Sequence, residues 1–363
     1  MNVGIVGLPQ SGKTTVFNAI IRGSAEVATY AAGEAEPNLG VAGVPDNRLD
    51  SLAAIFKPKR TVHAEIGYVD APSAADRSGG LVPRSALNDM HPADAIAVVV
   101  RAFEDPAVSH VDGSVDAARD AESALLELAL TDTGVLDRRL ARIEVGFKGL
   151  KAAERDALTR EQALVLRVKE SLEGGTAVSD QTITDDEARA LGGFGLLTGK
   201  PAIVVVNVGE DQADAANAVA ARVAASVGGQ VHTVAICGAL EMELAQLDPA
   251  EEAEMREGLG AGEPALERMA RVAHEAGDMV AFFTGNDNEV RSWTVPRGTT
   301  ALKAAGRIHS DFERGFIRAE VIGTPDLLEC GSAQAARKRG LLRSEGKDYV
   351  VQDGDVVNFL FSV

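Results

Sequence analysis

The stretch that most restricts the fold of this chain lies near its start, where residues 7–14 read GLPQSGKT. It matches the pattern G-x-x-x-x-G-K-[S/T], in which glycines let backbone N–H groups converge on phosphate oxygens. Such a loop needs a strand before it and a helix after it, because the N-terminal end of the helix also attracts the phosphate. The apolar run NVGIVGL precedes the loop, and a helical pattern follows from about Lys13. The sequence therefore predicts a phosphate-binding loop (P-loop) in an α/β domain.

Individual residues of this loop have separate expected roles. Lys13 would place its ammonium group against the β- and γ-phosphates and is the predicted catalytic lysine, while the hydroxyl of Thr14 is placed to bind Mg²⁺. Proteins with this loop also hold Mg²⁺ through an acidic residue at the end of another strand. Asp70 closes the strand-like segment HAEIGYVD and is the second predicted metal residue. The other nucleotide contacts expected from the loop are Gly7, Pro9, Gln10, Ser11, Gly12 and Thr15.

Strand-like and helical patterns alternate along most of the chain before Gly277, which predicts a parallel sheet flanked by helices. Residues 114–173 interrupt this alternation, because they are rich in Ala, Leu, Glu and Arg with apolar residues at helical spacing. They predict an antiparallel pair of long amphipathic helices, with a coiled-coil dimerisation device as the alternative. Short strand candidates after Gly277 predict a separate β-rich domain. The predicted domains are residues 1–112 and 198–277 (P-loop domain), 113–197 (helical arm) and 278–363 (C-terminal domain).

The charge and cysteine content narrow the classes of partner and compartment. Residues 281–363 carry equal numbers of acidic and basic side chains, so the whole net charge of −18 lies in residues 1–280. An acidic body argues against broad binding to DNA or other nucleic acids. The two cysteines are far apart in sequence, which favours a reducing compartment, and the longest apolar runs are only strand-sized. We therefore expect a cytoplasmic protein that does not cross a membrane.

A loop after a later strand usually sets the base specificity of such domains. In GTPases it reads N-K-x-D, and its aspartate accepts a hydrogen bond from the guanine amino group. Here the apolar run PAIVVV is followed by Asn207, Val208, Gly209 and Glu210. The lysine is absent and the acid is one methylene longer, which displaces the acceptor and weakens the case for guanine.

With these motifs and its C-terminus, the chain resembles the YchF/Obg-like ATPase family, a branch of the Obg-type P-loop proteins linked to translation. The resemblance covers almost the whole chain. It rests on GLPxxGKTTxFNAI, on EPNLGVAGVPDNRLDSLAAIFKPKR and on HVDGSVD. It is closest in FFTGNDNEVRSWTVPRGTTALKAAGRIHSDFERGFIRAEVI and LRSEGKDYVVQDGDVVNF, which are similar to the family's TGS domain, a ubiquitin-like β-grasp module.

The resemblance implies a Mg²⁺-dependent ATPase that prefers ATP to GTP and associates with ribosomes. Asn207, Val208 and Glu210 fall on the family's adenine loop, and Cys237 with Gly238 falls on the loop that braces the base. Family members lack the usual catalytic glutamine, and a loop histidine is considered to position the attacking water instead. That histidine corresponds to His110, for which an ordinary surface role is the alternative.

The sequence departs from the family pattern around the γ-phosphate. Ser73 replaces the switch glycine after Asp70, and the switch I segment from Tyr30 to Glu34 has no threonine before its E-P-N. Gln10 replaces an asparagine that helps relatives hold a monovalent cation, and the glycine-rich stretch 78–84 is altered too. Three hypotheses remain: a slow ATPase that cycles on the ribosome, a nucleotide-binding scaffold with impaired hydrolysis that acts through the arm and the TGS domain, and an Obg-type GTPase.

Basic residues of the C-terminal segment are candidates for RNA or ribosome contact, with a solvated and charge-balanced surface as the alternative. These residues are Arg291, Arg297, Lys303, Arg307, Arg314, Arg318 and the run Arg337–Arg339.

Overall fold

The computed structural model describes residues 1–23, 36–72, 87–147, 151–228 and 230–362. Its contacts divide the chain into two compact units. The larger unit comprises residues 2–42 and 67–276, and the smaller unit comprises Met1, residues 43–66 and residues 277–363. Residues 24–35 and 73–86, which include Tyr30 to Glu34, Ser73 and the stretch 78–84, lie outside the described residues.

The larger unit is built on a six-stranded sheet with the order β2-β4-β1-β5-β6-β7. Strand β1 pairs in parallel with β4 and β5, and the parallel pairing continues through β6 to β7, which confirms the expected parallel sheet. The central strand β5 is buried at every residue, as its continuous apolar sequence predicts. The strands are β1 (Asn2–Gly7), β2 (Asn38–Gly43), β4 (Glu65–Asp70), β5 (Ala95–Arg101), β6 (Ala202–Asn207) and β7 (His232–Ile236).

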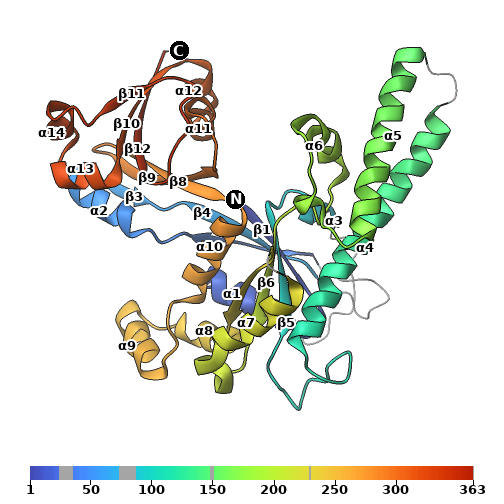
Figure 1. Cartoon of the computed structure of the whole chain (residues 1–363). Coiled ribbons are helices and arrows are strands. Elements are labelled where there is room, and N and C mark those ends of the chain that lie inside the picture. The colour runs from blue at the N-terminus through green and yellow to red at the C-terminus, as the bar shows by residue number, and fades with distance from the viewer. Residues whose placement is uncertain (24–35, 73–86, 148–150, 229, 363) are drawn as a thin grey trace. The chain divides into compact units, whose positions relative to one another are not determined.

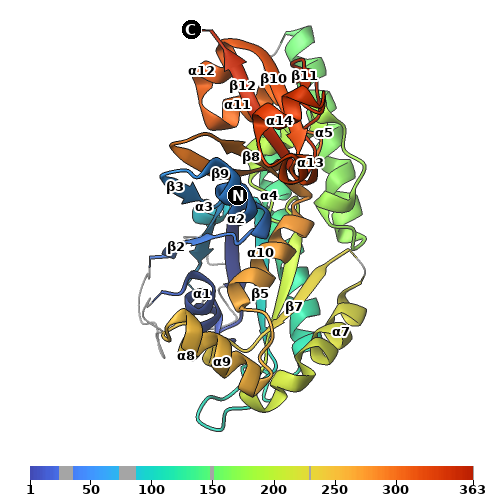
Figure 2. The same cartoon turned by 90° about the vertical axis from the view of Figure 1, so that its left-hand side faces the viewer.

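Helices cover both faces of this sheet, as parallel strands require. On one face α4 (Ala117–Gly146) and α7 (Ala216–Val227) pack their small apolar residues against alternate side chains of β5 and β6. On the other face lie α1 (Lys13–Ile21), α8 (Gly238–Leu244) and α10 (Ala265–Ala276) (Figure 2). This unit also contains α3 (Leu87–Met90), α9 (Pro249–Leu259) and 3₁₀ segments at Val178–Asp180, Gly192–Phe194 and Glu210–Ala215.

The long helix α4 continues beyond the sheet and pairs with α5 (Ala152–Glu173), which runs beside it in the opposite direction (Figure 1). These are the two helices expected in residues 114–173. Their apolar faces meet in a small core that also takes residues of the segment around α6 (Asp185–Leu191), and Arg139 joins Glu161 across the pair through bonds of 2.6 and 2.8 Å. Where the chain returns toward β6, residues 197–198 are held to α4 by Asp132, whose buried carboxylate accepts from Leu197 N, Thr198 N and Thr198 Oγ1 at 2.9, 2.7 and 2.6 Å.

The smaller unit has a second sheet, with the order β11-β10-β12-β8-β9-β3. Its strands are β3 (Arg60–Val62), β8 (Met279–Gly285), β9 (Glu289–Pro296), β10 (Phe316–Gly323), β11 (Arg343–Glu345) and β12 (Asp355–Phe361). Phe282, Val321 and Val357 pack with α11 (Ala301–Ile308) in one core. Other core residues pack with α2 (Asn47–Phe56), α13 (Thr324–Cys330) and α14 (Ala333–Lys338), and α12 (Ser310–Arg314) follows α11.

One segment differs from the predicted boundaries. Residues 43–66 were expected within the P-loop domain, but the structure places them in the smaller unit. Leu49 and Leu52 of α2 are fully buried with Phe283 and Val290, and β3 pairs in parallel with β9. The sequence pattern of this segment predicts an amphipathic helix that must pack on an apolar surface. The pattern does not indicate which of the two sheets provides that surface. In the described residues, no helix is both long enough and apolar enough to cross a bilayer.

Candidate nucleotide-binding site

The predicted P-loop connects the end of β1 to the start of α1. Gln10 and Gly12 both have left-handed backbones, with φ of 64° and 79°. A Cβ on Gly12 would lie 2.1 Å from Nδ2 of Asn207, and one on Gly7 would lie 2.6 Å from the carbonyl oxygen of Val99. Because real Cβ atoms do not approach so closely, glycine is required at both positions. The loop is therefore closely packed against the ends of β5 and β6 while its N–H groups remain at the start of a helix, the geometry that suits a phosphate.

Lys13 and Thr14 meet Asp70 at the carboxyl ends of β1 and β4. Lys13 Nζ lies 2.8 Å from Asp70 Oδ1, and Thr14 Oγ1 donates to Asp70 Oδ2 at 2.7 Å. Asn38 at the start of β2 donates to the same Oδ2 through its side-chain amide at 3.1 Å. Asp70 is only 2 % exposed, and its carboxylate is stabilised by the adjacent ammonium group and two neutral donors. The sequence predicts that Lys13, Thr14 and Asp70 belong to one site, but no pattern in it identifies Asn38.

These residues fit a Mg²⁺–nucleotide complex. Mg²⁺ prefers hard oxygen ligands and keeps several of its waters, so it needs a hydroxyl and a nearby carboxylate rather than a full protein cage. Thr14 Oγ1 and the buried carboxylate of Asp70 are in hydrogen-bond contact and provide that pair. The ammonium group of Lys13, 7 % exposed as a residue, lies beside them, where it can meet phosphate oxygens.

The predicted base loop is tied to the P-loop through Asn207. Its amide Nδ2 donates to the carbonyl oxygen of Ser11 at 3.0 Å, and its Oδ1 accepts from the backbone N–H of Gly238 at 3.1 Å. Asn207 thus fixes three loops at the same edge of the sheet: the P-loop, the end of β6 and the turn into α8. Glu210 is exposed two residues beyond the buried Val208.

The other predicted contacts have different environments. Cys237 is buried beside Gly238, and burial raises the pKa of its thiol, so it remains protonated near neutral pH. Ser11 is buried as well, and its hydroxyl has no hydrogen-bond partner among the described residues. Pro9 and Thr15 are half-buried, whereas Gln10 is exposed. The side chain of Gln10 is therefore accessible to solvent.

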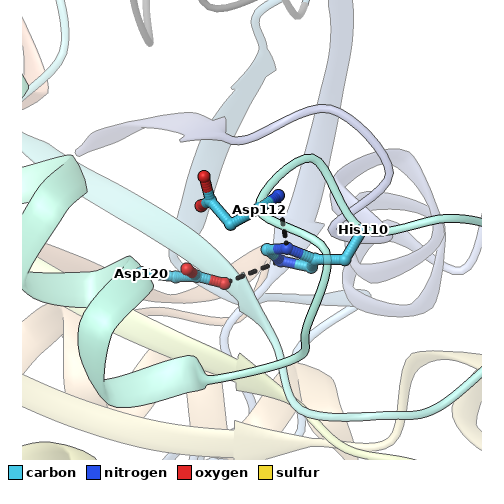
Figure 3. Close-up of side chains that lie close together, drawn as sticks. All are labelled: His110, Asp112 and Asp120. Carbon is cyan, nitrogen blue, oxygen red and sulfur yellow. Dashed lines mark hydrogen bonds and ion pairs between the residues drawn. The ribbon is translucent and has the colours of Figure 1, made fainter.

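Both ring nitrogens of His110 contact neighbouring groups of the protein (Figure 3). Its Nδ1 accepts from the backbone N–H of Asp112 at 3.1 Å, and its Nε2 lies 2.8 Å from Oδ2 of Asp120, which is on α4. The accepting role of Nδ1 assigns the ring proton to Nε2, facing the carboxylate. Both nitrogens are therefore engaged within the protein, and neither can take a proton from water in this arrangement.

The residues His110, Asp112 and Asp120 also have the residue types of a metal site, with ligand atoms within 4.8 Å of one another. A guanidinium group already balances the charge of this cluster. Arg119 donates to Oδ1 of Asp120 from Nε at 3.0 Å and Nη2 at 2.8 Å, and Nη2 lies 3.8 Å from Asp112. The cluster therefore holds the loop of His110 to the start of α4 through hydrogen bonds and ion pairs.

Comparison with protein families gives two matches. Residues 2–132 match the family described as 50S ribosome-binding GTPase, and residues 279–362 match the YchF-GTPase_C family, described as a protein of unknown function. The first match includes the P-loop and Asp70, and the second lies within the smaller unit.

Curated relatives match from end to end. The chain is 38 % identical to the "Ribosome-binding ATPase YchF" of Pasteurella multocida and of Escherichia coli O157:H7, in each case over 99 % of both chains. It is 37 % identical to the protein of the same name from Bacillus subtilis, over the full length of both.

Solved structures agree with this relationship. The YchF GTPase of Schizosaccharomyces pombe superimposes with a TM-score of 0.83 at 29 % identity, over 99 % of this chain and 97 % of that one. A GTP-binding protein of Pyrococcus horikoshii has the same fold, with a TM-score of 0.59 at 19 % identity over the full length of both. From its end-to-end identity to these relatives, the chain belongs to the YchF family of P-loop proteins.

Proposed function

We propose that this protein is a Mg²⁺-dependent ATPase that associates with the ribosome and works in the cytoplasm. The observation that carries the proposal is the convergence of Lys13, Thr14 and Asp70 beside a P-loop that requires glycine at Gly7 and Gly12. The names of the curated relatives, ribosome-binding ATPases, support both the reaction and the partner.

The expected roles follow from the contacts. Lys13 binds phosphate oxygens and balances charge that develops on them, and the P-loop N–H groups hold the same oxygens in place. Thr14 and Asp70 would hold the metal, which when bound neutralises phosphate charge. Asn207 keeps the base loop in register with the P-loop, so that the base and the phosphates are bound together.

A preference for ATP over GTP is the finer part of the proposal. It is supported by the absence of lysine and aspartate from the base loop, where Val208 and Glu210 stand instead. Calorimetric titration of the nucleotide-free protein with Mg-ATP and with Mg-GTP tests it directly. We expect ATP to bind more tightly, and tighter binding of GTP would assign the chain to the GTPases of the Obg group.

The environment of His110 favours slow hydrolysis. If this histidine is the residue that positions water, its loop must first leave Asp120, which limits the rate. A phosphate-release assay against a Lys13→Ala control separates a slow ATPase from a scaffold. Phosphate release no faster than in that control would leave the nucleotide-binding scaffold as the function.

A ribosome contact through the smaller unit is the last part of the proposal. We infer that this unit includes a TGS-like β-grasp module, since α11 packs on its mixed sheet in the sequence region that resembles TGS domains. Its basic run lies on and just after α14, where Arg337 pairs with Glu320 and Arg339 with Glu329. Pelleting with purified ribosomes, in the presence and absence of nucleotide, tests the association.

A further inference from the structure

The two oxygens of Asp70 have different kinds of partner. Oδ1 contacts only the cation Lys13 among the described side chains that bond it, at 2.8 Å. Oδ2 accepts from two neutral groups, the Thr14 hydroxyl at 2.7 Å and the Asn38 amide at 3.1 Å. The carboxylate is thus fixed through one oxygen and charge-paired through the other.

The roles expected for Lys13 and Thr14 make this difference important. When Lys13 turns to phosphate oxygens it withdraws from Oδ1, which is then free to accept from water around a metal. Thr14 can bind a metal through an oxygen lone pair and still donate its proton to Oδ2. Asn38 is not expected to bind phosphate or metal, so its bond to Oδ2 can remain while Lys13 and Thr14 engage the ligand.

Asn38 is also suited to this place by its charge. A lysine or arginine there would add a second cation beside the metal position, and an aspartate would repel Asp70 across about 3 Å. A neutral amide orients the carboxylate and leaves its full negative charge for the metal. The residue comes from β2, at the edge of the sheet, so this contact also links the edge strand to the metal position.

We propose that Asn38 is a positioning residue of the nucleotide site, which holds Oδ2 of Asp70 so that Oδ1 can pass from Lys13 to the hydration shell of Mg²⁺. The proposal rests on the proposed Mg²⁺–nucleotide function. It predicts a defect in metal dependence rather than in nucleotide binding as such.

The test measures nucleotide affinity as a function of free Mg²⁺ for wild type, Asn38→Leu, Asn38→Asp and Asn38→Gln, with ATP and GTP, and in EDTA. In Asn38→Leu we expect the Mg²⁺ concentration for half-maximal binding to rise about tenfold, the size of one lost hydrogen bond to a charged group. Affinity in EDTA should stay within about twofold of wild type. Asn38→Asp should be more defective and Asn38→Gln should recover part of the loss, because it keeps a donor.

Asn358→Leu is the matched control. Asn358 donates to the carboxylate of Glu320 at 3.3 Å from strand β12 in the smaller unit, so its loss removes a similar bond far along the chain from the P-loop. It should leave the Mg²⁺ dependence unchanged. Circular dichroism and melting curves of all variants show whether each is folded.

The alternative outcomes are distinct. Equal weakening with and without Mg²⁺, or no change in either, would overturn the role of Asn38. If wild type binds neither nucleotide, the proposed function fails by itself. Binding of Mn²⁺ to the protein, followed by electron paramagnetic resonance, then decides the case for Asn38: weaker binding in Asn38→Leu supports the role, and equal binding refutes it.

Discussion

Two aspartates in the larger unit are shielded from solvent to a similar degree but are held in opposite ways. Asp70 is 2 % exposed and accepts from three side chains, those of Lys13 and Thr14 on α1 and that of Asn38 on β2. Asp132 is fully buried and accepts from two backbone N–H groups and one hydroxyl, all within residues 197–198.

The difference indicates which buried charge can take part in a reaction. A side-chain donor can rotate away and return, so Lys13 can leave Asp70 for a phosphate oxygen while Asn38 keeps its bond. Backbone donors can leave only if the local structure opens, so Asp132 holds the helical arm to the chain that leads into β6. Both carboxylates satisfy the requirement that buried charge be hydrogen-bonded, but only the first leaves its partners available to a ligand.

The largest effect that tests this comparison is expected in Lys13→Ala. The substitution removes the cation that binds phosphate and leaves the carboxylate of Asp70 without its charge partner. We expect ATP affinity, measured by calorimetry, to fall by about a hundredfold or more, the scale of a lost buried charge pair. Lys303→Ala, which removes an exposed lysine of the smaller unit, should bind as wild type does. A loss smaller than tenfold would contradict the assignment of Lys13.

The substitution Asp132→Ala should lower stability without affecting nucleotide affinity. It leaves two buried backbone N–H groups unpaired, so the free energy of unfolding should fall by about 2–4 kcal/mol in urea titrations. Burial raises the pKa of Asp132 above its usual range despite these bonds, so the folded state binds its proton more tightly than the unfolded state does. Its contribution to stability is therefore fullest at low pH and decreases as pH rises through the native pKa. The gap between wild type and Asp132→Ala should narrow in that direction, and a gap that widens would refute the cause.

Asp120 is a third buried carboxylate, and its partners are the side chains of His110, on a loop, and of its sequence neighbour Arg119. Its substitution tests whether it acts in the reaction, as proposed for Asp70, or in stability alone, as expected for Asp132. We expect Asp120→Asn to release the loop and to raise ATP turnover by up to about tenfold, the factor that ~1.4 kcal/mol represents. Nucleotide affinity should not change, and the gain should disappear in Asp120→Asn/His110→Ala. Unchanged turnover with a lower melting temperature would place Asp120 with Asp132 as a structural residue.

The smallest effect on stability is expected at the surface of the smaller unit. Arg337 and Arg339 are 65 % and 54 % exposed in their ion pairs, so Arg337→Glu/Arg339→Glu should change the free energy of unfolding by less than about 1 kcal/mol. Pelleting with ribosomes should weaken nonetheless. Arg271→Glu is the matched control, since Arg271 is a similarly exposed, ion-paired arginine in the larger unit. Equal pelleting of the double variant and wild type would remove this basic run from the interface.

The parts of the site that are local in sequence could be predicted, and those that depend on distant pairing could not. The P-loop, Thr14 and Asp70 follow from a motif and a strand end, because loop geometry and strand direction determine where such residues lie. The bond from Asn38 to Asp70 depends on which strand takes the edge of the sheet, and no local pattern states that. The contact between His110 and Asp120 likewise depends on how a loop folds back onto the first turns of α4. The two bridging bonds of Asn207 require three loops to meet.

The placement of residues 43–66 has a consequence for how the protein is made. Because α2 and β3 complete a unit whose other strands begin at β8, the ribosome releases them more than two hundred residues before their partners exist. During that interval Leu49 and Leu52 cannot be buried, because Phe283 and Val290 have not yet been made. Strand β1, in contrast, pairs with β5, which is complete at Arg101. The apolar face of Leu49 and Leu52 is therefore open to aggregation until its partners from β8 onward emerge, and a fragment that stops at residue 276 would expose it permanently. The C-terminal segment therefore completes the core into which α2 and β3 fold.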